Sequence, residues 1–154
     1  MIEKIISGGQ TGVDQGALDF AMEQGIPCGG WCPKGRLCES GRIPDRYPVI
    51  EVADDDYNER TRKNVLAADG TLIIISGDIK EEGTWLTKTL CEQHGKPFLV
   101  IDILQSERIE MLKKGFRDWI RLSGIRMLNV AGNRESSSPG IQSATKTLLG
   151  QLIH

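Results

Sequence analysis

Short apolar runs alternate with amphipathic segments along the chain, and glycine or proline marks many of the boundaries. The runs have the length of strands and lie at residues 2–7, 26–30, 49–52, 71–75, 98–101 and 125–131. Most of them are continuously apolar, which is typical of strands buried on both faces of a parallel sheet. This pattern favours folds in which helices cover both sides of such a sheet.

Five of these runs are followed by a segment that we expect to be helical. The segments span about 13–24, 56–68, 84–94, 106–124 and 138–152. Thr11 is expected to cap the first helix, Ser106 the fourth, and Gly25 to end the first. Right-handed crossovers then predict an α/β, doubly wound, Rossmann-like fold: a mostly parallel sheet of five to six strands with helices on both faces. No linker or long repeat divides the sequence, so we expect residues 1–154 to form one domain.

Composition and charge exclude several classes of protein. Of the 154 residues, 39% are hydrophobic and 26% are charged, as in globular domains. The net charge of -2 argues against broad binding to a nucleic-acid backbone. The apolar run 72–75 is far shorter than the ~20 residues of a membrane span, and the N-terminus lacks a signal-peptide layout. We therefore expect a cytoplasmic protein that contacts neither nucleic acid nor membrane.

Polar, glycine-rich segments follow the predicted strands. They lie at residues 8–12, 33–36, 76–77 leading to 83–84, and 132–136. Because the carboxyl ends of parallel strands meet at one edge of the sheet, these segments should gather there. Ligands of doubly wound sheets bind at that edge.

The loop at residues 8–12 is the strongest local signal for a ligand. Its glycines allow close approach of the backbone to an anion, and the following helix directs its free N–H groups at the same point. Gly83 and Thr84 open a second helix in the same way. The pair of helix starts predicts a phosphate or another oxyanion between them; the alternative is a plain turn and a plain helix cap. The loop matches neither a Walker A motif nor a dinucleotide fingerprint.

Four cationic side chains, Lys34, Arg36, Arg60 and Arg62, are candidate partners of that anion. Trp31 and Trp85 either stack on a flat ring of the ligand or pack in the core. Asp14 and Asp69 are either acid/base groups or ordinary capping residues. The candidate ligand-binding residues are Gly8, Gly9, Gln10, Thr11, Gly12, Asp14, Lys34, Gly35, Arg36, Arg60, Arg62, Gly83, Thr84, Asn133 and Arg134.

Metal sites and the common catalytic sets are not indicated by the sequence. The cysteines at positions 28, 32, 38 and 91 match no common zinc spacing, which favours reduced, partly buried thiols over a soft-metal site at the first three. The two histidines, His94 and His154, lie away from the predicted cleft. There is no Gly-x-Ser-x-Gly and no His-Glu-x-x-His motif. We therefore assign no catalytic residue and no metal ligand.

Several segments resemble the molybdenum carrier family, whose members are related to molybdenum cofactor carriers and to the lysine-decarboxylase-like Rossmann proteins. The most specific is Ser7-Gly8-Gly9-Gln10-Thr11-Gly12-Val13-Asp14; the others are residues 33–36, 60–65, 68–73, 83–84, 95–97 and 128–135. The resemblance implies a Rossmann-like homo-oligomer that binds molybdenum cofactor, a phosphate-bearing pterin, or molybdate. It also implies molybdoenzymes as partners.

A rival resemblance is to the Lonely Guy phosphoribohydrolases, which cleave nucleoside monophosphates. These enzymes carry Pro-Gly-Gly-x-Gly-Thr-x-x-Glu, whereas this chain has Gly83-Thr84 without the preceding glycines and Thr87 where the glutamate would stand. These enzymes also carry an arginine on the preceding helix, and Arg60 is its candidate match. The absence of the glutamate carboxylate at position 87 would remove a general acid/base contribution of roughly 10²–10⁴-fold. Binding is therefore favoured over hydrolysis, and a nucleotide-sensing module is a third possibility.

Overall fold

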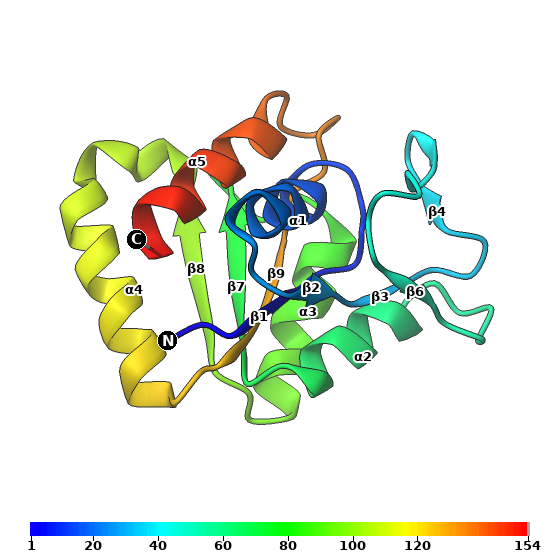
Figure 1. Cartoon of the computed structure of the whole chain (residues 1–154), viewed down its shortest axis with the longest axis horizontal. Coiled ribbons are helices and arrows are strands. Elements are labelled where there is room, and N and C mark those ends of the chain that lie inside the picture. The colour runs from blue at the N-terminus through cyan, green and yellow to red at the C-terminus, as the bar shows by residue number, and fades with distance from the viewer. Residues whose placement is uncertain (154) are drawn as a thin grey trace.

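A five-stranded parallel sheet forms the centre of the computed structural model, which describes residues 1–153 (Figure 1). The strands, in spatial order, are β2 (Cys28–Gly29), β1 (Lys4–Ile6), β9 (Met127–Gly132), β7 (Gly70–Ile75) and β8 (Phe98–Asp102). All neighbouring pairs in this sheet are parallel. Every residue of β7 is buried, as expected for a strand covered on both faces. His154 lies outside the described residues.

The last strand in the sequence lies in the middle of the sheet. β9 pairs with β1 on one side, where Ile5 is opposite Leu128, and with β7 on the other, where Ile73 is opposite Ala131. The loops that follow β1, β9 and β7 are therefore neighbours in space at the carboxyl edge. This is the edge at which the sequence predicted a ligand.

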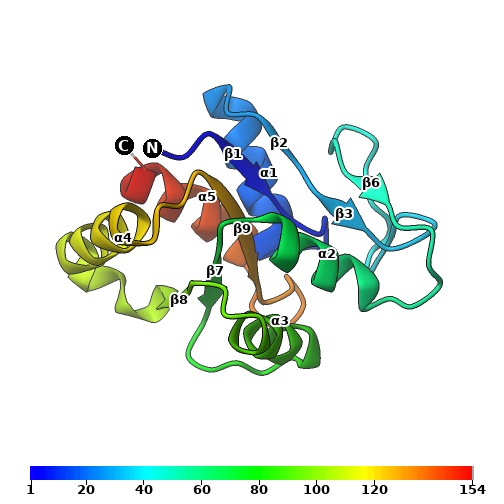
Figure 2. The same ribbon diagram turned by 90° about the horizontal axis from the view of Figure 1, so that it is seen from below.

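Helices cover both faces of the sheet (Figure 2). One face carries α1 (Val13–Gln24), α4 (Ile109–Ser123) and α5 (Ile141–Ile153), with α5 packed against both of the others. The opposite face carries α2 (Glu59–Ala67) and α3 (Glu82–Gln93), which pack against each other. This arrangement confirms the predicted α/β Rossmann-like fold. Within residues 1–153, no helix combines the length and the apolar character that a membrane span requires.

The helix ends agree only in part with the predicted caps. Gly25 ends α1 in the left-handed conformation, as expected from the sequence. The N-cap of α1 is Gly12, however, and not Thr11, whose hydroxyl is bonded elsewhere. The predicted cap at Ser106 is also wrong, because the 3₁₀ helix η1 (Ile103–Arg108) occupies that segment. The carboxylate of Asp102 starts η1 by accepting a hydrogen bond from the Leu104 N–H, so α4 begins later than predicted.

The predicted strand at 49–52 does not join the central sheet. Its residues form β6 (Ile50–Glu51), which pairs in parallel with β3 (Trp31–Cys32) in a separate two-stranded sheet. The side chain of Ile50 is 65% exposed, so this strand lacks the two-sided burial of the central strands. The intervening chain forms an antiparallel hairpin of β4 (Leu37–Cys38) and β5 (Gly41–Arg42).

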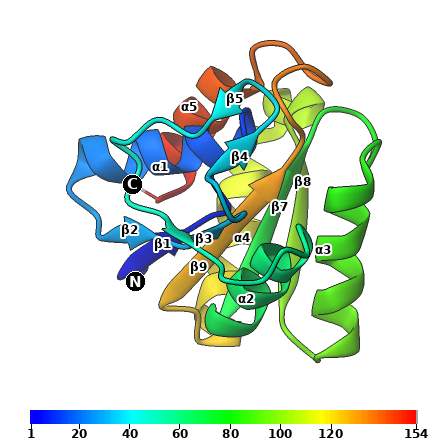
Figure 3. The ribbon, with the colours of Figure 1, turned by 90° about the vertical axis from the view of Figure 1, so that its right-hand side faces the viewer.

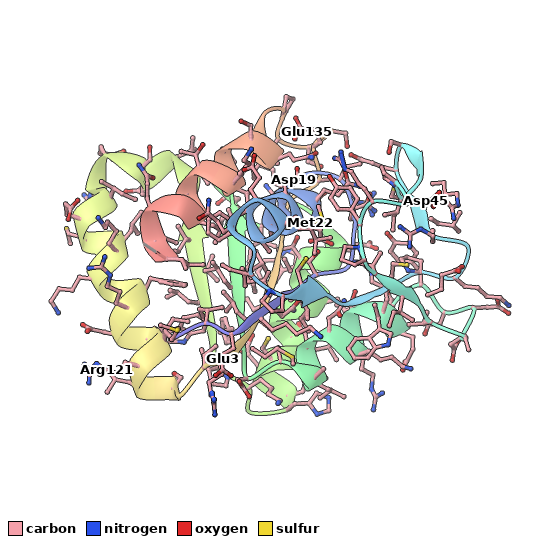
Figure 4. The ribbon with its side chains drawn as sticks, viewed as in Figure 1. Glu3, Asp19, Met22, Asp45, Arg121 and Glu135 are labelled. Carbon is pink, nitrogen blue, oxygen red and sulfur yellow. The ribbon has the colours of Figure 1, made fainter. Side chains whose placement is uncertain are left out.

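A single arginine organises the long segment between β3 and β6. The guanidinium of Arg36 donates hydrogen bonds to four backbone carbonyls, those of Ile43, Pro44, Tyr47 and Val49. A small apolar core beneath it joins Ile43, Tyr47 and Val49 to α1 through Leu18. The hydroxyl of Tyr47 also donates to Asp19, a residue labelled on α1 in Figure 4. The segment is therefore anchored to the sheet by α1.

Two helical glycines offer a matched test of how closely α1 and α5 pack. A Cβ at Gly16 in α1 would lie 2.4 Å from the Gln142 carbonyl oxygen, whereas a Cβ at Gly115 in α4 would meet no atom within 4 Å. Alanine raises helix propensity equally at both sites. We expect Gly16→Ala to lower the free energy of unfolding by about 1–3 kcal/mol through overpacking. Gly115→Ala should raise it by about 0.5–1 kcal/mol. Urea unfolding measures both; equal effects would contradict the close packing.

Candidate functional site

A cleft lies at the carboxyl ends of β1, β9 and β7, between the first turns of α2 and α3. In Figure 3 the loop after β9 and the connection from β7 to α3 both lie at the top of the sheet. The cleft has a volume of about 50 Å³. Its lining residues are Gly8, Gln10, Asp14, Tyr57, Asn58, Arg60, Thr61, Asn64, Glu81, Gly83, Thr84, Thr87, Asn129, Ala131, Gly132 and Arg134. Because α1 covers one face of the sheet and α3 the other, the cleft lies where the winding of the sheet changes direction.

A buried ion pair occupies one wall of the cleft. Nη1 of Arg60 lies 3.2 Å from Oδ2 of Asp14, and the two side chains are only 12% and 7% exposed. The backbone N–H of Gln10 donates to the same oxygen. A Cβ at Gly8 would lie 1.7 Å from Nη1 of Arg60, so the ion pair needs a residue without a side chain at position 8.

Burial dominates the ionisation of Asp14. Removal from water raises the pKa of the carboxyl, while the charge of Arg60 and the hydrogen bond from Gln10 oppose that rise without cancelling it. The nearby carboxylate of Glu81 raises the pKa further. The pKa of the Asp14 carboxyl is therefore held above its usual range.

Tyr57 covers the guanidinium at the mouth of the cleft. The Arg60 guanidinium carbon lies 5.1 Å from the centre of the Tyr57 ring, and the phenol oxygen accepts a 2.8 Å hydrogen bond from Nε2 of Gln10. Nε of Arg60 is buried and has no hydrogen-bond partner among the described residues. A guanidinium N–H left unpaired inside a protein is costly, and this one belongs to a residue that lines the cleft.

The first turn of α3 forms the opposite wall. Its opening N–H groups have no partner within the helix, and the space around Gly83 is open for at least 4 Å. Glu81 precedes the helix, and its two carboxylate oxygens each accept from the Arg134 N–H at 3.0 Å. Thr87 is buried and donates to the Gly83 carbonyl at 2.9 Å. The position at which the phosphoribohydrolase motif has glutamate therefore carries a hydroxyl that is already bonded.

The structure brings some of the sequence candidates into the cleft and leaves the others outside it. Those that line it are Gly8, Gln10, Asp14, Arg60, Gly83, Thr84 and Arg134. Those that do not are Gly9, Thr11, Gly12, Lys34, Gly35, Arg36, Arg62 and Asn133. Neither Trp31 nor Trp85 lines the cleft; Trp85 is 51% exposed on α3.

Each charged candidate outside the cleft has another partner. Lys34 pairs with Asp55, and Arg62 pairs with Glu59, both at the surface. Arg36 is held by the backbone carbonyls described above.

Asn133 supports the loop after β9 from within the protein. It is fully buried, its side chain donates to Ser138, and its carbonyl accepts from the Val13 N–H. The same carbonyl lies against Gly12, where a Cβ would be 2.4 Å away. The loops after β1 and β9 therefore pack directly on one another.

Nine further residues that line the cleft are not among the sequence candidates, and Tyr57, Glu81 and Asn129 are three of them. Asn129 had a detectable signal, because it is a polar residue inside an apolar strand. Its side chain donates to the Thr71 hydroxyl across the sheet. Tyr57 and Glu81 lie in irregular segments before helices, where the sequence has no periodicity that would orient them.

The alternative acid/base candidate and the cysteines lie elsewhere. Asp69 precedes β7 at the opposite edge, where hydrogen bonds from the Met127 and Arg126 N–H groups lower its pKa. Cys32 and Cys91 are buried, while Cys28 and Cys38 are partly buried. No group of three or more His, Cys, Asp or Glu side chains within residues 1–153 is arranged to hold a metal ion.

The fold and the cleft define a Rossmann-like protein with a polar cleft at the carboxyl edge of its sheet. The model of the circularly permutated YpsA SLOG family matches residues 5–153, and the chain belongs to that family. A solved structure from Syntrophus aciditrophicus SB, named "Putative molybdenum carrier protein", is 48% identical to this chain. The match covers 99% of this chain and 96% of that one, with a TM-score of 0.93. None of the curated proteins compared with the chain matches it. These matches confirm the family resemblance predicted from the sequence.

Replacement of Asp14 should change how stability depends on pH. Because its pKa is raised on folding, Asp14 contributes stability that is present below the unfolded pKa of about 4 and lost as pH rises through the folded pKa. We expect the free energy of unfolding of the wild type, relative to Asp14→Asn, to fall as pH rises above about 4.

Urea unfolding at several pH values between 4 and 8 measures this difference. Asp118→Asn is the matched control, because Lys114 lowers the pKa of that exposed carboxyl and its contribution is lost only on acidification. A constant or rising difference for Asp14→Asn would contradict the assignment.

Proposed function

We propose that this protein is a molybdenum or molybdenum-cofactor carrier that binds a small phosphate-bearing ligand, with an anionic group of the ligand in the cleft. The observation that carries the proposal is the buried, unpartnered Nε of Arg60, a residue that lines the cleft together with Gly83 and Thr84 of α3. The 48% identity to a protein named as a molybdenum carrier supports this choice of cargo. The proposal includes a single-domain homo-oligomer that works in the cytoplasm and delivers its cargo to molybdoenzymes.

The cleft has the chemistry to hold an oxyanion. A guanidinium presents several N–H donors in a plane, which suits phosphate oxygens, and the start of α3 adds N–H groups and the positive end of a helix dipole. Arg134 lines the same space and is 42% exposed at its side chain. These groups lie on different elements, so an anion between them would join α2, α3 and the loop after β9.

Asp14 offers a way to balance the charge of an incoming anion. In the described state its carboxylate pairs with Arg60. Its raised pKa favours uptake of a proton when a negative group approaches, because a second anion nearby makes the charged carboxyl still less stable. Protonation of Asp14 would leave the positive charge of Arg60 without its partner carboxylate, so that Arg60 could pair with the anionic ligand instead. Tyr57 at the mouth is the aromatic side chain available to a flat ring such as a pterin.

The two arginines of α2 provide a matched test. Arg60 lines the cleft, whereas Arg62, two residues later, pairs with Glu59 at the surface. We expect Arg60→Ala to weaken the binding of molybdenum cofactor by roughly 10- to 150-fold, because a charged hydrogen bond contributes about 1.5–3 kcal/mol. Arg62→Ala should bind as the wild type does. Isothermal titration measures affinity, and circular dichroism checks that the variants fold; Arg60→Lys retains the charge that pairs with Asp14 if the alanine variant does not fold.

Parallel titrations with AMP and molybdate distinguish the ligands. Molybdenum cofactor should bind more tightly than AMP in the same buffer. If AMP binds at least as tightly, the carrier proposal fails and a nucleotide-binding role replaces it. Metal analysis and mass spectrometry of the protein purified from its native source test the cargo independently.

A second candidate function is hydrolysis of a nucleoside monophosphate. The observation that favours it is the presence of two carboxylates, Asp14 and Glu81, in the cleft that contains Thr87. A carboxyl with a raised pKa can act as a general acid.

We nevertheless expect no release of ribose 5-phosphate from AMP at an enzyme-like rate of ~1 s⁻¹. Asp14 is tied to Arg60, and Glu81 accepts the Arg134 N–H with both oxygens. A coupled assay for the free sugar phosphate measures the rate. Turnover that is lost in Asp14→Asn or Glu81→Gln would establish hydrolysis in place of binding.

A further inference from the structure

A glutamate from a distant hairpin binds the loops at the carboxyl ends of β1 and β9. Oε1 of Glu39 accepts from the Ser136 N–H at 3.1 Å and from the Thr11 hydroxyl. Oε2 accepts from the Ser136 hydroxyl at 2.6 Å. In Figure 3 the β4–β5 hairpin lies at the top of the sheet beside the loop that follows β9. One carboxylate therefore takes up three donors from two separate loops.

We propose that Thr11 and Ser136 form a second oxyanion subsite, next to the cleft, that Glu39 fills as an internal anion until a phosphate group or molybdate displaces it. The inference deepens the proposed function and rests on it for the nature of the ligand. The donor set itself is observed with an anion in place, namely the carboxylate of Glu39. Two hydroxyls and an N–H that converge on one negative group would bind a tetrahedral oxyanion by the same hydrogen bonds.

The surroundings of the subsite favour a negative group over a neutral one. Burial opposes the ionisation of Glu39, but hydrogen bonds from Ser136 and Thr11 and the charge of Arg134 outweigh it and lower the pKa of the carboxyl. Two other carboxylates contact the same loop: Glu135 accepts from the Gly140 and Gln142 N–H groups at the start of α5, and Glu81 accepts from the Arg134 N–H and the Ser137 hydroxyl. Figure 4 labels Glu135 on the loop between β9 and α5. Glu135 is therefore engaged with α5 and does not take up the donors of the subsite.

Little else fastens the tip of the hairpin to the protein. Leu37 is 56% exposed, and Ser40, Gly41 and Arg42 are exposed as well. Besides its carboxylate, Glu39 contributes one backbone hydrogen bond, from its N–H to Oε1 of Gln10 at 2.9 Å. An incoming anion would accept the same three hydrogen bonds as the carboxylate of Glu39. Because the residues of the tip are already exposed, its displacement would uncover little apolar surface.

The subsite is linked to the cleft through Gln10. The same side chain that accepts from the Glu39 N–H donates from Nε2 to the Tyr57 hydroxyl, and Gln10 lines the cleft. Arg134 is a second link between the cleft and the subsite, because it lines the cleft and precedes Ser136 by two residues. A ligand with two anionic groups, such as a phosphate and a metal oxyanion, would use the cleft for one and the subsite for the other.

Removal of the internal anion is the direct test. Glu39→Ala should bind inorganic phosphate roughly tenfold or more tightly than the wild type, because the donors no longer have a competing carboxylate. The ¹H–¹⁵N signals of Thr11 and Ser136 should shift on titration. Ser40→Ala is the matched control at the same hairpin tip, and it should bind phosphate as the wild type does. Thr11→Val with Ser136→Ala, added to Glu39→Ala, should remove most of the gain, because only the Ser136 N–H of the three donors remains.

The outcomes separate this inference from the proposed function. A gain in Glu39→Ala that depends on Thr11 and Ser136 supports the subsite even if Arg60→Ala leaves cofactor binding unchanged. Phosphate affinity in Glu39→Ala no higher than in the wild type overturns the subsite. A gain that persists in full in the triple variant also overturns it, because the anion would then be bound elsewhere. Replacement of phosphate by molybdate in the same titrations tests whether the free metal oxyanion is accepted.

Discussion

The pairing of β9 with both β1 and β7 is the constraint on which the rest of the structure depends. Because the last strand enters the middle of the sheet, the loops after the first, the third and the last central strands meet at one point. The Asn133 carbonyl and the Gly12 N-cap come into contact there, which leaves no room for a side chain at position 12. The cleft and the contacts of Glu39 both rest on this junction.

A buried Arg60–Asp14 pair at this junction is better explained by function than by stability. Desolvating two charges costs several kcal/mol per ion, and a buried pair often stabilises a fold less than apolar residues of the same size would. The unpartnered Nε of Arg60 adds to that cost. The buried guanidinium of Arg60 lowers stability, but its place in a cleft opposite the first turn of α3 suits it to bind an anion from solution. Two carboxylates of the chain itself accept from neighbouring donors: Asp14 pairs with Nη1 of Arg60, and Glu39 accepts from Thr11 and Ser136.

Much of the fold could be predicted because it depends on patterns that are local in sequence. The apolar run 71–75 and the glycine at position 25 indicate a buried strand and a helix end without knowledge of any distant residue. For residues 49–52 the sequence predicted a strand but not the sheet to which it belongs. The same apolar pattern suits a strand in the main sheet and a short strand in a two-stranded extension. Thr11 illustrates the same limit: a good capping residue binds Glu39, 28 positions away in sequence.

The sequence by itself determined the Rossmann-like class, the edge of the sheet at which the glycine-rich loops gather, and the family. Only the tertiary structure decided which charged residues share the cleft. Arg60 and Arg62 look alike in sequence, but residues two apart on a helix point about 200° apart, so one faces Asp14 and the other faces solvent. The guanidinium of Arg36 donates its hydrogen bonds to backbone carbonyls of its own loop. The physical reason is that a charged side chain pairs with whichever partner lies nearest in space, and Asp14, the partner of Arg60, is 46 positions away in sequence and is brought close only by folding.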